Sequence, residues 1–142
     1  MKQLFIPITL CFICFVISNA SWANNYSTPE QAVNDYVKAV QTGTSSYIEN
    51  AFEQTARIQY YNPEGKLLNY SRDEFAKLVN TGNEWAATIE ITNMLLTGNV
   101  ANATVEFTWG ENSQHGFVDY LNLINDGESW HIVSKVAQYV ER

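Results

Sequence analysis

The chain has 142 residues, of which 46% are hydrophobic, and carries a net charge of −7 at neutral pH. This length is enough for one domain that buries its own hydrophobic core. A chain this acidic is poorly suited to binding nucleic acid and gains nothing from anionic lipid surfaces.

The N-terminus has the pattern of a secretory signal peptide. Lys2 gives a short positive start, Leu4–Ile17 is almost entirely apolar, and Ser21-Trp22-Ala23 offers a small-x-small cleavage site. The apolar stretch is shorter than the roughly 20 residues that span a bilayer. We therefore predict a signal peptide over residues 1–23 and an exported protein, periplasmic or secreted. Ser18-Asn19-Ala20 is an alternative cleavage site.

The predicted mature domain, residues 24–142, lacks cysteine, because Cys11 and Cys14 both lie in the signal peptide. It can form neither a disulfide nor a cysteine nucleophile. Lys2 is the only charged residue removed, so the domain carries −8. We expect no nucleic-acid partner and no membrane contact for the mature form.

Three helices are predicted ahead of the long strands. Thr28-Pro29-Glu30-Gln31 reads as a capping box with proline at the first helical position, and Gly43 ends this helix. A short helix is expected from Ser45 or the next residue. Ser71-Arg72-Asp73-Glu74 is a second capping box, and the helix it opens ends by Gly82.

Strand patterns fill most of the remaining sequence. Residues 57–61 and 66–70 flank the turn Asn62-Pro63-Glu64-Gly65 and predict a hairpin. Four longer strands follow, at residues 85–96, 100–109, 116–124 and 129–140. Helices grouped ahead of an antiparallel meander predict an α+β domain with the helices on one face of a curved sheet.

One residue in these strands draws attention to chemistry. Asp119 is the only charged residue of Gly116–Ile124, and it shares an alternation face with Phe117, Leu121 and Leu123. A carboxylate on a buried face must be hydrogen-bonded or held protonated, and such groups cluster at functional sites. The alternatives are a solvent-facing aspartate, since the other face is also largely apolar, or one satisfied by a backbone partner.

The order of elements resembles the NTF2-like superfamily, whose cone-shaped, cystatin-like roll wraps a bent sheet around an interior pocket. The local sequence is most similar to the branch described as SnoaL-like and putative lumazine-binding. The similar segments are Tyr36–Gly43, Asp73–Phe75, Val118–Leu123 and Trp130–Lys135. The resemblance covers nearly all of residues 24–142.

Ketosteroid isomerase belongs to this superfamily and uses a tyrosine and a protonated aspartic acid to bind an enolate oxygen, while a second aspartate moves the proton. The resemblance implies that Tyr36 and Asp119 correspond to the first two groups. The proton-moving aspartate is expected near Ile58–Pro63, a stretch without a carboxylate. Tyr60 and Trp109 are further candidates for the pocket wall. Tyr36 also fits a purely structural role on the buried stripe of its helix.

Three functions remain open at this point. The first is a non-catalytic pocket that binds a small, mostly apolar, oxygen-bearing molecule, which the missing base favours. The second is an isomerase, cyclase or dehydratase of the ketosteroid isomerase–SnoaL type. The third is an interaction module whose exposed sheet face pairs with a second copy, as a homodimer, or with a partner. Nothing implies a cofactor, and His115 and His131 lack the spacing of metal ligands.

Overall fold

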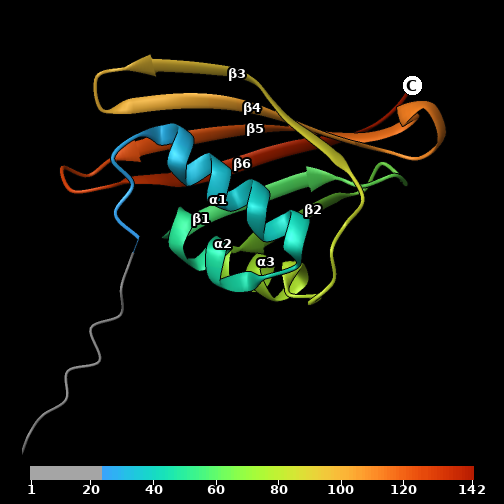
Figure 1. Ribbon diagram of the computed structural model, residues 1–142, viewed down its shortest axis with the longest axis horizontal. Coiled ribbons are helices and arrows are strands. Elements are labelled where there is room, and N and C mark those ends of the chain that lie inside the picture. The colour runs from blue at the N-terminus through green and yellow to red at the C-terminus, as the bar shows by residue number, and fades with distance from the viewer. Residues whose placement is uncertain (1–23) are drawn as a thin grey trace, which may run out of the picture.

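The computed structural model describes residues 24–142, so the predicted signal peptide lies outside the described residues. Three helices and six strands make up this part of the chain (Figure 1). In chain order the elements are α1 (Pro29–Thr42), α2 (Ser45–Ala51), β1 (Phe52–Tyr61), β2 (Leu67–Ser71), α3 (Arg72–Val79), β3 (Thr88–Thr97), β4 (Val100–Trp109), the short 3₁₀ turn η1 (Glu111–Ser113), β5 (His115–Asn125) and β6 (Trp130–Glu141).

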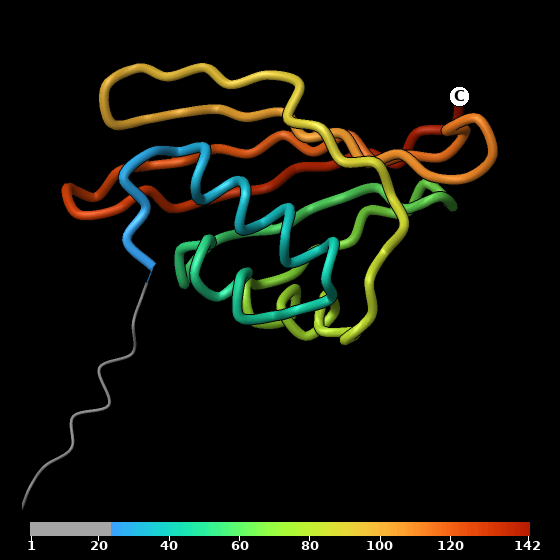
Figure 2. The backbone as a smooth tube through the Cα atoms, in the orientation of Figure 1, coloured from blue at the N-terminus to red at the C-terminus, as the bar shows by residue number. Residues whose placement is uncertain are grey.

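The six strands form one sheet in the order β2-β1-β6-β5-β4-β3. Neighbouring strands are antiparallel except β1 and β6, which pair in parallel although they lie far apart in sequence (Figure 2). All three helices lie on the same side of the sheet (Figure 1). The predicted α+β architecture, with helices on one face of a mainly antiparallel sheet, is confirmed.

The helix ends follow the predicted capping signals. Ser71 Oγ accepts a hydrogen bond from the backbone of Glu74 at 3.3 Å, and the Glu74 carboxylate accepts one from the Ser71 backbone at 2.8 Å. At α1, the Gln31 side chain accepts from the Thr28 backbone at 3.4 Å. Gly43 follows α1 with φ of +64°, a left-handed conformation that glycine adopts without steric cost.

Two strand boundaries differ from the prediction by more than one residue. β1 begins at Phe52, directly after α2, and not at Arg57, because Phe52 pairs with Ile132 of β6 before the register shifts. β3 begins at Thr88 and not at Trp85. The Trp85 backbone instead donates to Gln41 O at the end of α1 (2.9 Å), which keeps residues 80–87 against the helices.

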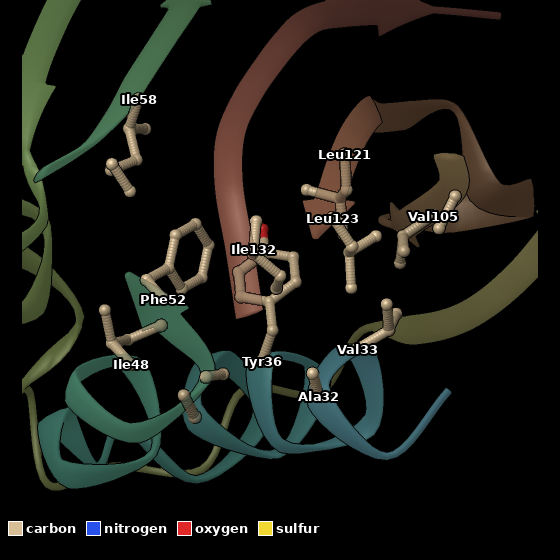
Figure 3. Packing of buried hydrophobic residues seen from close by; sticks show 14 of the residues in the cluster. Ala32, Val33, Tyr36, Ile48, Phe52, Ile58, Val105, Leu121, Leu123 and Ile132 are labelled. Carbon is tan, nitrogen blue, oxygen red and sulfur yellow. The ribbon is translucent and has the colours of Figure 1, made fainter. Parts of the chain in front are cut away.

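The core lies between the helices and the inner face of the sheet. Val33 and Tyr36 of α1 point toward Leu121 and Leu123 of β5 and Ile132 of β6 (Figure 3). These five side chains are at most 1% exposed. None of the helices between residues 24 and 142 combines the length and apolar character needed to cross a bilayer.

Candidate functional site

A cavity of about 160 Å³ opens between the inner face of the sheet and the ends of α1 and α3. Its wall includes six aromatic rings and two charged side chains. The lining residues are Tyr36, Val40, Tyr60, Phe75, Leu78, Val79, Trp85, Phe107, Phe117, Asp119 and Lys135.

Three polar side chains from three elements meet at the inner wall of this cavity. The Tyr36 hydroxyl of α1 donates to Asp119 Oδ2 of β5. Lys135 Nζ of β6 lies 2.6 Å from the same Asp119 oxygen and 2.7 Å from the Tyr36 hydroxyl oxygen. We call these residues the polar trio. All three are buried, with Asp119 at 0%, Tyr36 at 1% and Lys135 at 7% exposure.

The electrostatics of the trio are those of a buried ion pair. The resemblance to ketosteroid isomerase implied a protonated aspartic acid at position 119. The structure pairs this carboxyl group with Lys135, whose Nζ lies 2.6 Å from Asp119 Oδ2 in a buried salt bridge. Burial, followed by the negative charge of Asp119, raises the pKa of Tyr36 well above 10, so its hydroxyl keeps its proton.

Lys135 is the site residue that the sequence did not reveal. Counting alternate residues from the buried Trp130 and Ile132 places Ser134 on the inner face and Lys135 outside. In the structure, Leu123 pairs with Ile132 but Asn122 pairs with Ser134, so one extra residue, Val133, is inserted in β6. This β-bulge shifts the alternation by one position and turns Lys135 into the core.

The side chain of Lys135 then lies close to Asp119 by strand register. Lys135 pairs with Leu121 of β5, two positions from Asp119 on the same face. Diagonal neighbours of this kind are within reach of a long side chain. The only available signal was a single lysine in the strand, and the bulge hid its direction.

The two other predicted wall residues differ in their placement. Tyr60 lines the cavity and stacks on Tyr70 with ring centroids 5.9 Å apart. Burial and the hydrogen bond with Tyr70 raise the pKa of Tyr60 to about 12. Trp109 lies behind the wall and contacts the lining residues Trp85 and Phe117 at centroid distances of 5.0 and 5.8 Å.

Among the lining residues of the described part of the chain there is no second carboxylate and no histidine that could act as a proton acceptor beside the trio. Residues 58–63, where the resemblance placed the base, contribute Tyr60 to the wall. His115 bonds to the Tyr139 hydroxyl through Nδ1 at 2.7 Å, and His131 lies 3.6 Å from Asp126. Residues 24–142 contain no cluster of three or more side chains suited to hold a metal ion.

Comparisons with known proteins agree with this fold. An NTF2-like protein of unknown function from Silicibacter pomeroyi DSS-3 is 29% identical, with a TM-score of 0.67 over 78% of this chain and 91% of that one. A similar protein, also of unknown function, from Methylobacillus flagellatus KT is 29% identical, with a TM-score of 0.66 over 78% and 88% of the two chains.

A more distant structure shares the fold alone. It is a ketosteroid isomerase-like protein from Erwinia carotovora atroseptica SCRI1043, 12% identical, with a TM-score of 0.61 over 80% of this chain and 94% of that one. No curated protein matches the sequence. A family model described as "Putative lumazine-binding" matches residues 25–138. The chain therefore belongs to this family and has the NTF2-like fold.

Proposed function

We propose that this protein binds a small, mostly apolar, oxygen-bearing molecule in the cavity and releases it unchanged. The observation that carries the proposal is the polar trio, a buried group of hydrogen-bonding side chains on the wall of an otherwise apolar, aromatic cavity. Ligand pockets typically combine apolar walls with a few convergent polar groups of this kind.

The cavity composition supports binding over catalysis. A proton transfer needs an acceptor within hydrogen-bond reach, and positioned acid–base groups contribute roughly 10²–10⁴-fold to a rate. Asp119 is the only carboxylate that residues 24–142 contribute to the wall; its Oδ2 is engaged by Tyr36 and Lys135, and its Oδ1 is buried beside that ion pair. The wall can therefore hold an oxygen without providing a separate base.

The family description suggests one class of ligand to test first. Lumazine is a flat, uncharged, bicyclic ring system with N–H and C=O groups at its edge. Such a molecule matches a wall made of aromatic rings and a polar trio. We propose a ligand panel of single-ring amides and ketones, which match a cavity of about 160 Å³, with lumazine as its larger, bicyclic member.

Binding can be measured through Trp85, because its ring lines the cavity and stacks on Phe107 with centroids 5.9 Å apart. We expect ligands to change tryptophan fluorescence in the wild type and not in Trp85→Phe. Calorimetry should give a dissociation constant that Asp119→Ala weakens. Tyr36→Phe, which removes the hydroxyl that holds Asp119, should weaken binding as well. Tyr120 is an exposed tyrosine next to Asp119 on the outer face, so Tyr120→Phe is the matched control and should leave binding unchanged.

Two results would overturn this proposal. Steady turnover of a ketosteroid or related enone by the wild type would show an enzyme with its base elsewhere in the cavity. Failure of every panel member to bind would remove the pocket function and favour the interaction module.

The outer face of the sheet supports a homodimer as a second proposal. Tyr120, Ile124 and Val136 are 51%, 44% and 48% exposed on strands β5 and β6. Apolar surface of this kind is stabilised when a second copy covers it. Sedimentation equilibrium should show a dimer that Tyr120→Lys dissociates; a wild-type monomer at high concentration would exclude it.

Export is also proposed on the sequence pattern of residues 1–23. Intact mass measurement of protein recovered from outside the cytoplasm should give a chain that begins at Asn24. A chain that retains Met1 would contradict export by this route.

A further inference from the structure

The polar trio uses most, but not all, of its hydrogen-bonding capacity internally. The Tyr36 hydroxyl donates its single hydrogen bond to Asp119 and accepts one from Lys135. The Lys135 ammonium has three N–H donors and directs two of them at Tyr36 and Asp119. Asp119 Oδ1 is buried and has no hydrogen-bond partner among residues 24–142. One donor on Lys135 and one acceptor on Asp119 therefore remain.

The net charge of the cavity wall is zero. Of the lining residues within 24–142, only Asp119 and Lys135 are charged, and they neutralise each other at 2.6 Å. An uncharged ligand can enter without burying a net charge. A carboxylate ligand brings a second negative charge beside Asp119, and burying an unpaired charge is strongly unfavourable.

The size and lining of the cavity indicate a ring. An apolar cavity of roughly 150 Å³ holds one benzene molecule, and this cavity measures about 160 Å³. The aromatic wall residues are Tyr36, Tyr60, Phe75, Trp85, Phe107 and Phe117. Stacked and edge-on contacts with these rings favour a flat aromatic ligand over a flexible chain.

We propose that the ligand is an uncharged ring carrying a hydrogen-bond acceptor next to a donor, such as a carboxamide or lactam, and that Lys135 donates to its oxygen while Asp119 Oδ1 accepts from its N–H. This inference rests on the proposed binding function and names its ligand class. Tyr36 has a positioning role, since its proton is already committed to Asp119.

The two ligand contacts differ in access. Lys135 is 7% exposed and in reach of a ligand in the cavity. Asp119 is 0% exposed, so a ligand donor reaches Oδ1 only with a small rotation of the Asp119 side chain or its neighbours. The interaction compensates for this adjustment, because a buried carboxylate oxygen without a partner is costly.

Four single-ring probes of similar size separate the contributions of the ligand's hydrogen-bond acceptor, its hydrogen-bond donor and its charge to the affinity. Benzamide has acceptor and donor, acetophenone has the acceptor alone, benzoate is an anion, and toluene has neither group. We expect calorimetry to rank benzamide tightest and benzoate weakest of the three polar probes. The ratio between these two should be at least roughly tenfold, since a hydrogen bond to a charged group typically contributes that much.

A matched variant removes the polar trio without leaving a buried charge. Tyr36→Phe/Asp119→Leu/Lys135→Met replaces all three side chains by apolar ones of similar shape, a change that buried ion pairs often tolerate. Circular dichroism checks its folding. It should bind toluene and lose the preference for benzamide over acetophenone. Lys77→Met, which removes an exposed lysine of α3, should keep the wild-type order.

The possible outcomes separate the two proposals. Benzoate binding tightest, equal affinities for all polar probes, or an unchanged order in the apolar variant would each overturn the ligand class and leave the pocket function standing. Failure of the wild type to bind any probe, toluene included, would overturn the pocket function itself.

Discussion

The space between the helices and the sheet is filled at one end and hollow at the other, although β5 and β6 supply both ends. At the filled end Leu121, Leu123 and Ile132 pack against α1 (Figure 3). At the hollow end Asp119 and Lys135 of the same strands face the cavity.

The difference arises from what covers the sheet rather than from the sheet itself. α1 ends at Thr42, and residues 80–87 continue the cover as an irregular segment held by backbone hydrogen bonds to Gly43 and Gln41. At the hollow end, the ends of α1 and α3 and the Trp85 side chain of this segment line the cavity without filling it, whereas at the filled end α1 packs directly on the sheet. Stability should therefore depend on the filled end, and ligand binding on the hollow end.

The largest expected effect tests the charge balance of the hollow end. Lys135→Met should lower the free energy of unfolding by about 3–5 kcal/mol, because it leaves Asp119 buried without its counter-charge. Adding Asp119→Leu should recover most of this loss. Guanidinium denaturation of both variants measures the difference. Equal stability of wild type and Lys135→Met would mean that water reaches Asp119.

A leucine pair compares the two ends directly. Leu121 is fully buried at the filled end, whereas Leu78 lines the cavity and is 50% exposed. Leu121→Ala should cost about 2–5 kcal/mol of unfolding free energy, the usual range for a buried leucine. Leu78→Ala should cost well under half of that. Similar losses for the two variants would contradict the division between filled and hollow ends.

A glycine pair tests the irregular cover. Gly43 and Gly98 both have positive φ, at +64° and +57°, so alanine at either position costs about 1–2 kcal/mol in backbone strain. At Gly43 the added Cβ also lies 2.8 Å from Asn83 O, whereas at Gly98 it meets open space. Gly43→Ala should therefore lose more stability in thermal unfolding and also weaken ligand binding. Unchanged binding would show that the cover is not needed.

The smallest expected effect concerns alkaline pH. The folded protein raises the pKa of Tyr36 above its unfolded value near 10, so folding keeps a proton that the unfolded chain releases. The contribution of Tyr36 to the free energy of unfolding is fully present below about pH 10. It decreases as the pH rises further, by at most about 1.4 kcal/mol per pH unit. Tyr36→Phe should show a shallower decline in denaturation midpoints. An identical decline would mean that other tyrosines with a raised pKa, such as Tyr60, cause the effect in place of Tyr36.

Local signals in the sequence predicted most of the fold. The capping boxes at Thr28 and Ser71 and the stop at Gly43 predicted the helix limits, whereas alternation left the direction of Asp119 open, because both faces of its strand are largely apolar. Each of these features depends on residues within a few positions of one another. The family resemblance then brought Tyr36 and Asp119 together, and the structure places them in direct contact.

The features that the sequence did not predict depend on pairing between distant segments of the chain. The first half of β1 forms because Phe52 meets Ile132, and Lys135 turns inward because of the bulge at Val133. Neither pairing leaves a local pattern in the sequence. Periodicity in the sequence therefore could not predict the ion pair of the hollow end, although Asp119 stood out as the only charged residue of Gly116–Ile124.

The parallel pairing of β1 with β6 has a consequence for how the protein folds. Phe52 and Ile132 are separated by 80 positions, and β6 lies in the interior of the sheet between β1 and β5. Local hairpins can form early, but the two halves of the sheet cannot join until residues 130–141 are available. Topologies dominated by such distant contacts fold slowly, in roughly milliseconds to seconds. The cavity, whose wall draws on both halves, is therefore among the last features to form.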